Sequence, residues 1–528
     1  MVPNETHEAK HAHRSHFMRA LGAFGSATLI SRVLGYARDA AVAAYFGGGY
    51  QTDAFYAAFK IPNLLRRFLG EGSLTTSFVP VFADTLKKKG KEEASHLFDA
   101  VFSGMVVLLS VIVILGIIFA PQVTKLVSWG FTRDPAVFAL TTRLTRLTFP
   151  FLLLICLAAL VTAVLNSCGV FFIPAVAPSG LSIGEIAFIV LVATRMDDPI
   201  AGLALAAVLG VAIHFVWQLP ALYEQGYRLH FVKPFDHPEV KTILLLMIPH
   251  VIGLCADQVN SFVDQFCASF LQEGAITALY NSNRVMQLPL ALFGVAVASV
   301  ALPALSHSAS EEKLPEFKEM LSFSLRIANY VLIPSFVGLA VVGMPIVRLL
   351  FQHGHFKPEY TVMTYGAMVG FSAGLPAFSA TRILASAFYA RKNTKTPVRI
   401  AFQALTVNAV LDFALMWKWN VGGLAFATAA AGWYQAVILF FLLRKELGNL
   451  DGRAILRSFV FSCLAGVAMG IVCYVLSFVL LTKLPNSLNV LISVGGGSLF
   501  YLLLSRLLKV EEYRILIDIV RRRKLPAA

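Results

Sequence analysis

The stretch VVLLSVIVILGIIF, residues 106–119, contains no charged side chain. A transmembrane β-strand would alternate lipid-facing and inward-facing residue types over about ten positions, and this stretch does not alternate. An apolar segment of this kind can cross the bilayer as a helix, because a helix satisfies its backbone hydrogen bonds within the segment. The stretch therefore predicts a membrane-spanning helix and excludes a membrane β-barrel.

Apolar runs of this kind recur almost from end to end of the chain. Of 528 residues, 57% are hydrophobic and 14% are charged, whereas about a quarter of the residues in a soluble domain are charged. This balance excludes a soluble enzyme and a disordered scaffold. We predict an all-α polytopic membrane protein with about 14 transmembrane helices of roughly 20 residues each. The predicted spans are centred near residues 34, 66, 108, 152, 184, 210, 256, 290, 332, 372, 406, 432, 466 and 497.

Lysines and arginines mark one side of the predicted membrane protein. They follow the second, tenth and twelfth spans and recur in the tail, whereas the loops of the other side hold few. Because basic loops stay in the cytoplasm and an even span count puts both termini on one side, we expect both termini to be cytoplasmic. Topology and lipid headgroups thus explain the net charge of +14, and we expect no nucleic-acid partner. The bases concerned are Lys87, Lys88, Lys89, Lys91, Arg391, Lys392, Lys395, Arg399, Arg444, Lys445, Arg453, Arg457, Arg521, Arg522, Arg523 and Lys524.

Prolines repeat at a fixed offset along the chain. Pro80 and Pro303 are 223 residues apart, and so are Pro174 and Pro397. This offset covers about six spans, which predicts two six-helix lobes of the same orientation around a central cavity. Two lobes that enclose one cavity need no second copy, so we expect a monomer. The expected parts are a cytoplasmic N-terminal extension (1–22), an N-lobe of spans 1–6 (23–225), a C-lobe of spans 7–12 (240–447), spans 13–14 (455–510) and a basic cytoplasmic tail (511–528).

Motifs of covalent chemistry are missing from the sequence. The six cysteines form no C-x-x-C pair, so neither a disulfide framework nor a zinc site is indicated. The chain has no Walker-type P-loop and no H-E-x-x-H stretch. We therefore expect a transporter rather than an enzyme, without an organic cofactor.

Ionisable residues inside the predicted spans are the most informative feature for function. Each costs about 3 kcal/mol in a span unless it reaches water or a partner. Arginine's planar fork suits phosphate, and a diphosphate needs several such forks. We predict that the arginines line a cavity and bind a diphosphate; the alternative is that they extend to lipid headgroups or pair with nearby acids. The first two spans hold Arg32, Arg38, Asp39, Asp53, Arg66, Arg67 and Glu71, the fifth holds Glu185 without an assigned role, and the eighth holds Arg284.

A second polar group is expected in the C-lobe. Asn408 and Asp412 are four residues apart and share a helix face. Asp264 in the seventh span and Thr428 in the twelfth offer further oxygen atoms. Hard oxygen ligands suit a Na⁺ ion or a proton, whose gradient can be coupled to a conformational change. Hydrogen bonding between packed helices, without an ion, is the alternative.

The first two spans also carry a recognisable signature. Its stretches, with weaker ones that follow across both lobes, are Ser31–Asp39 (SRVLGYARD), Phe46-Gly47, Asp53-Ala54-Phe55, Ile61–Arg67 (IPNLLRR), Glu71-Gly72, Phe78-Val79-Pro80, Asn283-Arg284, Phe388-Tyr389-Ala390 and Thr394–Val398 (TKTPV). By these stretches the chain resembles the MurJ (MviN) family of lipid II flippases, most specifically at its amino-terminal end.

The resemblance implies a fourteen-span member of the multidrug/oligosaccharidyl-lipid/polysaccharide exporter superfamily that moves lipid-linked peptidoglycan precursor across the bacterial cytoplasmic membrane. Two departures from the family pattern stand out: Gln287 replaces an acid common in relatives, and Asn393 replaces the usual Asp before Thr-Lys-Thr-Pro. The positions that match the family's cavity charges are Arg32, Arg38, Asp53, Arg66, Arg67 and Arg284, and those that match its cation site are Asp264, Asn408, Asp412 and Thr428.

The expected function is flipping of lipid II, the undecaprenyl-diphosphate-linked disaccharide-pentapeptide, by alternating access. Membrane lipids and the machinery of peptidoglycan synthesis are the other expected partners. A flippase for another polyprenyl-diphosphate glycan uses the same clamp and is the nearest alternative. A cation-coupled drug exporter fits an arginine-lined cavity poorly, because its substrates are cationic. A membrane scaffold for cell-wall synthases, without transport of its own, tolerates neutral residues in place of the arginines.

Overall fold

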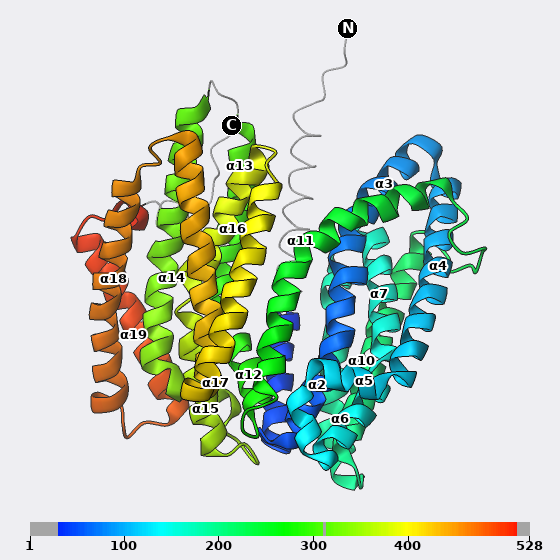
Figure 1. Ribbon diagram of the computed structural model, residues 1–528, viewed down its shortest axis with the longest axis horizontal. Coiled ribbons are helices and arrows are strands. Elements are labelled where there is room, and N and C mark those ends of the chain that lie inside the picture. Colours follow the sequence, from blue (N-terminus) through cyan, green and yellow to red (C-terminus); the bar gives the residue numbers. More distant parts are fainter. Residues whose placement is uncertain (1–29, 310–312, 515–528) are drawn as a thin grey trace. The chain divides into compact units, whose positions relative to one another are not determined.

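The structure is a computed structural model that describes residues 30–309 and 313–514, and these ranges contain helices and no strand (Figure 1). The chain forms two compact units, Met1–Gln258 and Val259–Ala528. The predicted extension (1–22) and most of the predicted tail (511–528) lie outside the described residues. The lobe boundaries 23–225, 240–447 and 455–510 stay predictions.

Unit 1 consists of a helix over residues 30–46 and the elements that follow it. Two of its helices begin at an aspartate whose side chain accepts backbone N–H groups, followed by proline in the first turn: Asp134 caps α6 and Asp198 caps α10. The elements are α2 (Tyr50–Arg66), η1 (Arg67–Glu71), α3 (Ser73–Lys89), α4 (Lys91–Ile118), α5 (Ala120–Val127), η2 (Trp129–Arg133), α6 (Pro135–Thr148), α7 (Pro150–Ser167), α8 (Phe172–Val176), α9 (Ser179–Leu191), η3 (Ala193–Arg195), α10 (Pro199–Glu224) and the first part of α11 (Pro238–Ala268).

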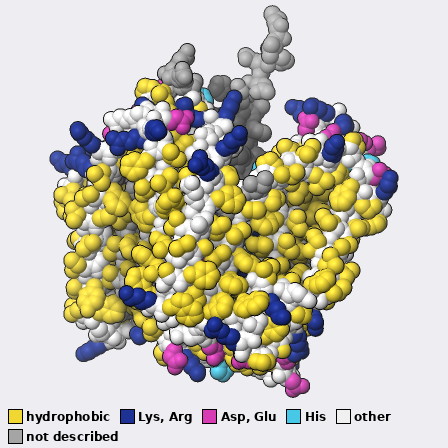
Figure 2. Space-filling model, in the orientation of Figure 1, with side chains coloured by type: hydrophobic (Ala, Val, Ile, Leu, Met, Phe, Trp, Pro, Cys, Tyr) yellow, Lys and Arg dark blue, Asp and Glu magenta, His cyan; other side chains and the backbone are white. Residues whose placement is uncertain are grey.

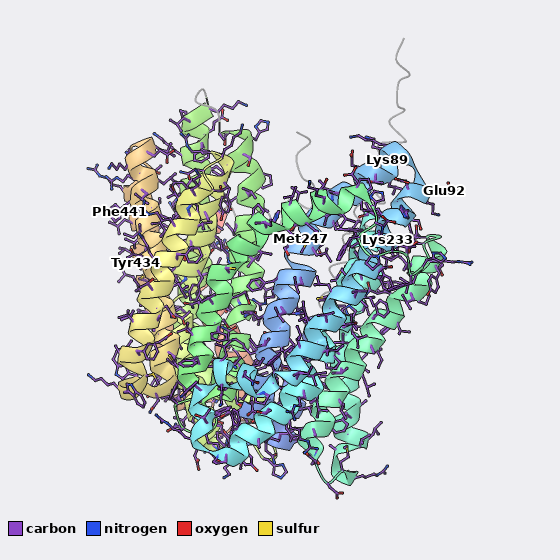
Figure 3. The ribbon with its side chains drawn as sticks, turned by 45° about the vertical axis from the view of Figure 1, so that its right-hand side comes forward. Lys89, Glu92, Lys233, Met247, Tyr434 and Phe441 are labelled. Atoms are coloured by element: carbon purple, nitrogen blue, oxygen red, sulfur yellow. The ribbon has the colours of Figure 1, made fainter. Side chains whose placement is uncertain are left out.

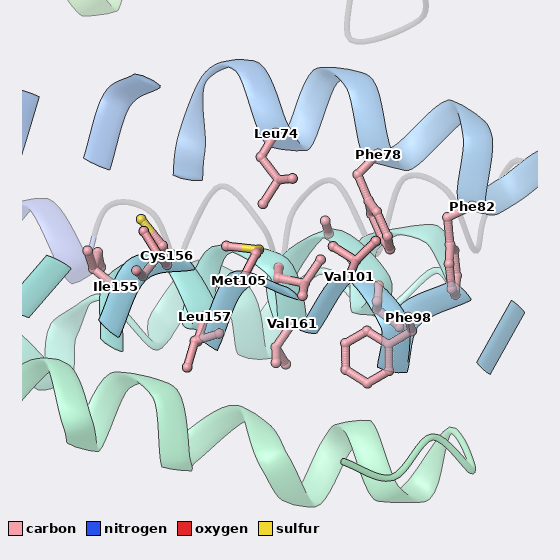
Figure 4. Close-up of a cluster of buried hydrophobic side chains, with 14 of the residues drawn as sticks. Leu74, Phe78, Phe82, Phe98, Val101, Met105, Ile155, Cys156, Leu157 and Val161 are labelled. Atoms are coloured by element: carbon pink, nitrogen blue, oxygen red, sulfur yellow. The ribbon is translucent and has the colours of Figure 1, made fainter. Parts of the chain in front are cut away.

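The apolar core of unit 1 lies between α3, α4 and α7 (Figure 4). Phe78 and Phe82 stack with their ring centroids 5.2 Å apart and are fully buried, as is Phe98. On α4, Met105 and Leu109 face this core, while the opposite face exposes a stripe of large apolar side chains. A helix that is apolar all round needs an apolar surrounding on its outer face as well, which a bilayer provides. The exposed stripe of α4 is Val107, Val111, Ile114 and Ile118.

A tight turn joins α3 to α4 at one end of unit 1. Gly90 adopts a φ of +89°, which a residue with a side chain rarely takes. Lys89 before the turn lies 3.2 Å from Glu239 at the start of α11. Figure 3 shows Lys89 and Glu92 at this turn and Lys233 in the loop between α10 and α11. Charged side chains therefore gather at this helix end.

Helices α9 and α10 approach each other backbone to backbone. A Cβ atom added at Gly210 would lie 2.8 Å from Leu181 Cα, and one added at Gly184 would lie 2.9 Å from Gly210 Cα. Small residues permit such close packing between membrane helices. The glycine contact fixes the position of α9, and with it the position of Glu185.

Gly210→Ala is expected to lower the free energy of unfolding by about 1–3 kcal/mol, because the new Cβ meets backbone atoms that cannot rotate away. The melting temperature of the purified protein in detergent measures this loss. Gly495→Ala is the matched control, because a Cβ there has open space around it on the exposed side of its helix. Equal melting temperatures for the two variants would contradict the close contact.

Unit 2 contains the rest of α11 and the helices that follow. The longest helix, Lys395–Leu447, is bent at Asn420, whose φ of 49° and ψ of −135° are not helical. Tyr501 donates a hydrogen bond of 2.8 Å to the Tyr330 carbonyl, which holds α19 against α14. The elements are α12 (Ala275–Pro289), η4 (Leu290–Val295), α13 (Ala296–His307), α14 (Leu314–Phe351), α15 (Pro358–Ser372), α16 (Leu375–Ala390), α17 (Lys395–Leu447), α18 (Gly452–Val475), η6 (Leu476–Leu480) and α19 (Asn486–Leu507).

The helices of both units suit a membrane. Ten helices of the described ranges are long and apolar enough to cross one. Each of the fourteen predicted span centres falls within a helix. The two parts of α17, which meet at the non-helical Asn420, count as one of the ten, and residues 30–46, α2 and α11 are not among the ten, so the count of fourteen stays a prediction. On the face seen in Figure 2, hydrophobic side chains cover the middle of the helices, and Lys and Arg gather toward the helix ends. The all-α membrane fold predicted from the sequence is confirmed.

Candidate functional site

The predicted basic residues of unit 1 lie on consecutive elements. Arg38 is on the helix 30–46, and Asp53 is buried in the first turn of α2. At the other end of α2, Pro62 lies inside the helix, and the five residues after Arg66 form a π-helical turn that includes Arg67. π-helical turns are rare in proteins, and those that occur are frequently found at functional sites. Arg32 and Arg67 are exposed, and Arg38 and Arg66 are partly buried.

Arg38 is held between two buried carboxylates. Its Nη2 and Nε atoms lie 2.6 and 3.0 Å from Asp39 Oδ1, and its Nε lies 3.7 Å from Glu185 Oε2 on α9. The side chains of Arg38, Asp39 and Glu185 are 12%, 2% and 5% exposed. The guanidinium is therefore positioned by charge on both sides. Sequence reasoning named Glu185 without a role, because the chain shows a charge in a span but not which helix it faces.

Arg284, the last of the predicted arginines, lies on α12 in unit 2 and is partly buried. Gln287, one turn later on the same helix, has its amide next to Asn283 Oδ1. The expected convergence of Arg284 with the arginines of unit 1 stays a prediction.

The four predicted oxygen ligands of unit 2 lie together. Thr428 Oγ1 lies 3.2 and 3.3 Å from the two carboxylate oxygens of Asp264. Asn408 takes the amide orientation that satisfies both of its polar atoms: its nitrogen lies 2.8 Å from Asp412 Oδ2 and 3.3 Å from Asp264 Oδ1, and its oxygen accepts from Thr428. All of these come from α11 and from both sides of the bend in α17.

One further residue belongs to this cluster. Asn260 Oδ1 lies 2.9 Å from the Asn408 nitrogen. Asn260 precedes Asp264 by four residues on α11, as Asn408 precedes Asp412 on α17. The same spacing on the seventh span was the sequence signal for Asn260, and the sequence analysis missed it.

The chemistry of the cluster suits a small cation. Asp264, Asn408 and Asp412 are buried, and Asp412 Oδ1 is enclosed without a hydrogen-bond partner among the residues that the structure describes. Two buried carboxylates that share one neighbourhood repel each other unless a cation or a proton lies between them. The carboxylate and hydroxyl oxygens of Asp264, Asp412 and Thr428 suit Na⁺ or H⁺ rather than a soft transition metal. Asn408 would add its amide oxygen only by turning its amide, since its nitrogen faces the two carboxylates.

Glu93, His96 and His237 form another cluster, in unit 1, with their ligand atoms within 4.8 Å of one another. His237 Nδ1 accepts a hydrogen bond of 3.1 Å from the Glu239 amide, so the imidazole proton resides on Nε2. His237 Nε2 lies 3.2 Å from Glu93 Oε1 and donates to it. A nitrogen that donates has no lone pair for a metal, so this cluster is a hydrogen-bonded contact between α4 and the start of α11.

Comparison with known proteins gives one consistent family. The family model described as lipid II flippase MurJ matches residues 42–494. A probable lipid II flippase MurJ from Vibrio cholerae serotype O1 is 34% identical over 420 residues, which are 78% of this chain and 80% of the relative. The lipid II flippase MurJ from Burkholderia cenocepacia is 33% identical over 432 residues, which are 81% of this chain and 84% of the relative.

Solved structures agree with the sequence comparisons. A structure titled as lipid II flippase MurJ in an inward closed conformation matches with a TM-score of 0.78 and 28% identity, over 94% of this chain and 99% of the other. An inward-facing multidrug resistance MATE transporter of the MOP superfamily matches with a TM-score of 0.65 and 12% identity, over 82% of this chain and 99% of the other. The second likeness concerns the fold alone.

Proposed function

Because this chain belongs to the lipid II flippase MurJ family, we propose that it moves lipid II from the inner to the outer leaflet of the cytoplasmic membrane. The observation that carries the proposal is the family match, which covers residues 42–494. The family consists of transporters rather than enzymes, and the apolar helices make the chain a multi-pass protein of the bacterial inner membrane.

The arginines are proposed to bind the diphosphate that links the lipid to its sugars. Arg38 supports this role because it is only partly exposed and already carries carboxylates in the position that phosphate oxygens would take. A guanidinium in a low-dielectric site binds an anion more strongly than it does in water. The full clamp is proposed to consist of Arg32, Arg38, Asp53, Arg66, Arg67 and Arg284.

Transport is proposed to follow alternating access. The clamp takes the diphosphate from the cytoplasmic side while the polyprenyl tail stays in lipid, and the lobes then rock so that the headgroup is released outside. Release requires weaker binding in the outward state, because a ligand that binds both states equally shifts nothing. The membrane potential, negative inside, favours outward movement of the anionic headgroup.

The oxygen cluster of unit 2 is proposed to bind the coupling ion, Na⁺ or H⁺. Asp412 and Thr428 lie on opposite sides of the bend at Asn420, and Asp264 lies on α11. A cation held by these three residues would tie both halves of α17 to α11, so its binding would favour one angle of the bend. This provides a physical path from ion occupancy to helix geometry within one unit.

The proposal also covers topology and partners. Both termini are proposed to face the cytoplasm, since Lys87, Lys88 and Lys89 lie at the same end of α3 and the loop bases favour that side. The protein is proposed to work as a monomer alongside the peptidoglycan synthesis machinery.

The test in cells is depletion of the protein, followed by an externally added enzyme that cleaves only lipid II already in the outer leaflet. We expect loss of the cleavable precursor, with recovery when the wild-type protein is restored. Unchanged cleavage with sustained growth would favour another glycan lipid as substrate, and competition between glycan lipids would then identify it.

A further inference from the structure

Glu185 is a buried carboxylate next to the proposed clamp, and it has no role in the transport steps proposed above. It lies on α9, and its Oε2 is 3.7 Å from Arg38 Nε. A carboxylate in a membrane span costs free energy unless it has a partner or a function. The partner of Glu185 is Arg38, the residue proposed to bind the substrate's phosphate.

The packing around Glu185 keeps it in this position. Its neighbour Gly184 makes the close contact between α9 and α10. One turn further along, Val42 from the Arg38 helix and Ile189 from α9 belong to the same buried apolar cluster. The contact with α10 therefore holds α9 beside Glu185, and the shared apolar cluster places α9 next to the Arg38 helix one turn away. Glu185 faces Arg38 without having to move there.

Two carboxylates, Asp39 and Glu185, already lie at the Arg38 guanidinium. A phosphate that binds Arg38 brings a further anion to the same mostly buried place, and the repulsion between the anions favours the loss of one carboxylate contact. The Asp39 contact comes from the adjacent residue and is the shorter, at 2.6 Å against 3.7 Å for Glu185. Glu185 is the partner that phosphate displaces at the lower cost.

We propose that Glu185 is a positioning residue that competes with the substrate's diphosphate for Arg38. It holds Arg38 in place while the site is empty, and it reclaims Arg38 when the diphosphate leaves, so that the clamp does not bind its substrate too tightly to release it. The inference rests on the proposed function, because it assigns the competitor of the phosphate at the same arginine.

The test is Glu185→Gln, which keeps the shape and removes the charge. Binding of lipid II and of undecaprenyl diphosphate to the purified protein is expected to tighten by about tenfold, since one repelling and competing charge is gone. Flipping in liposomes is expected to slow, because release becomes harder. Tighter binding with slower transport separates this role from a structural one, which would weaken both.

Glu446→Gln is the matched control, because Glu446 pairs with Arg391 at a partly exposed position near the end of α17. It is expected to leave affinity and rate unchanged. Glu185→Asp keeps the charge but withdraws it from Arg38, so its affinity and rate should lie between those of wild type and Glu185→Gln; this variant also decides the matter if the Gln protein does not fold.

Unchanged or weaker binding in both Glu185 variants would overturn the inference. If the wild-type protein itself neither binds nor flips lipid II, the proposed function fails instead. Wild-type transport thus separates the two failures.

Discussion

Arg38→Lys is expected to bind lipid II about 10- to 100-fold more weakly than wild type and to lose most of its transport. Lysine keeps the positive charge but offers no planar fork, so the bidentate contact with phosphate is lost. A hydrogen bond to a charged group is worth about 1.5–3 kcal/mol, which sets the expected range. Equilibrium binding and flipping in liposomes measure the two effects.

The choice of lysine matters because Arg38→Ala leaves Asp39 and Glu185 buried without their cation, and breaking a buried ion pair costs about 3–5 kcal/mol. That variant would lose function through folding as well as through binding. Arg143→Lys is the control, since Arg143 pairs with Asp198 at an exposed position of the same unit and such pairs contribute about 0–1 kcal/mol. Wild-type affinity in Arg38→Lys would exclude Arg38 from the clamp.

Asp412→Asn is expected to abolish the effect of Na⁺ on the protein. A cation at 100 times its dissociation constant stabilises the folded state by about 2.7 kcal/mol, so wild type should melt a few degrees higher in NaCl than in choline chloride. Asparagine keeps the shape and removes the charge that neutralises the ion. The melting temperature and the transport rate in the two salts are the measurements.

Asp84→Asn is the control, because Asp84 pairs with Lys88 at an exposed position on α3; it should keep the response of wild type. If the melting temperature and transport rate of wild type change with pH but not with Na⁺, and Asp412→Asn removes the change with pH, the ion is a proton. An Asp412→Asn protein with the full response of wild type to either ion would contradict the cation site.

The helical membrane fold follows from the sequence because span length and hydropathy are local properties. The oxygen cluster also follows in large part: the spacing of Asn408 and Asp412 is a helix period, and both lie on the face that meets Asp264. The break at Asn420 follows in part, because the spans predicted near residues 406 and 432 place a joint between them, where Lys418, Gly422 and Gly423 interrupt the apolar run. The positive φ of Asn420 itself does not follow from the sequence.

The pairing of Glu185 with Arg38 shows where sequence reasoning ends. Burial of a charge can be predicted from its place in a span, but its partner depends on which helices cross and at what height. The glycines set the contact of α9, which carries Glu185, with α10, and their spacing becomes meaningful only beside that second helix. Gly210 therefore contributes to the site although it has no side chain, because it lets α9 pack closely enough to hold Glu185 in position.

The most direct test of the central claim is to reconstitute the purified protein in liposomes that carry lipid II in the inner leaflet only, and to follow cleavage by an enzyme added outside. We expect cleavage of lipid II that depends on the wild-type protein and that is largely lost in Arg38→Lys. Protected lipid II in the presence of folded wild-type protein would contradict it.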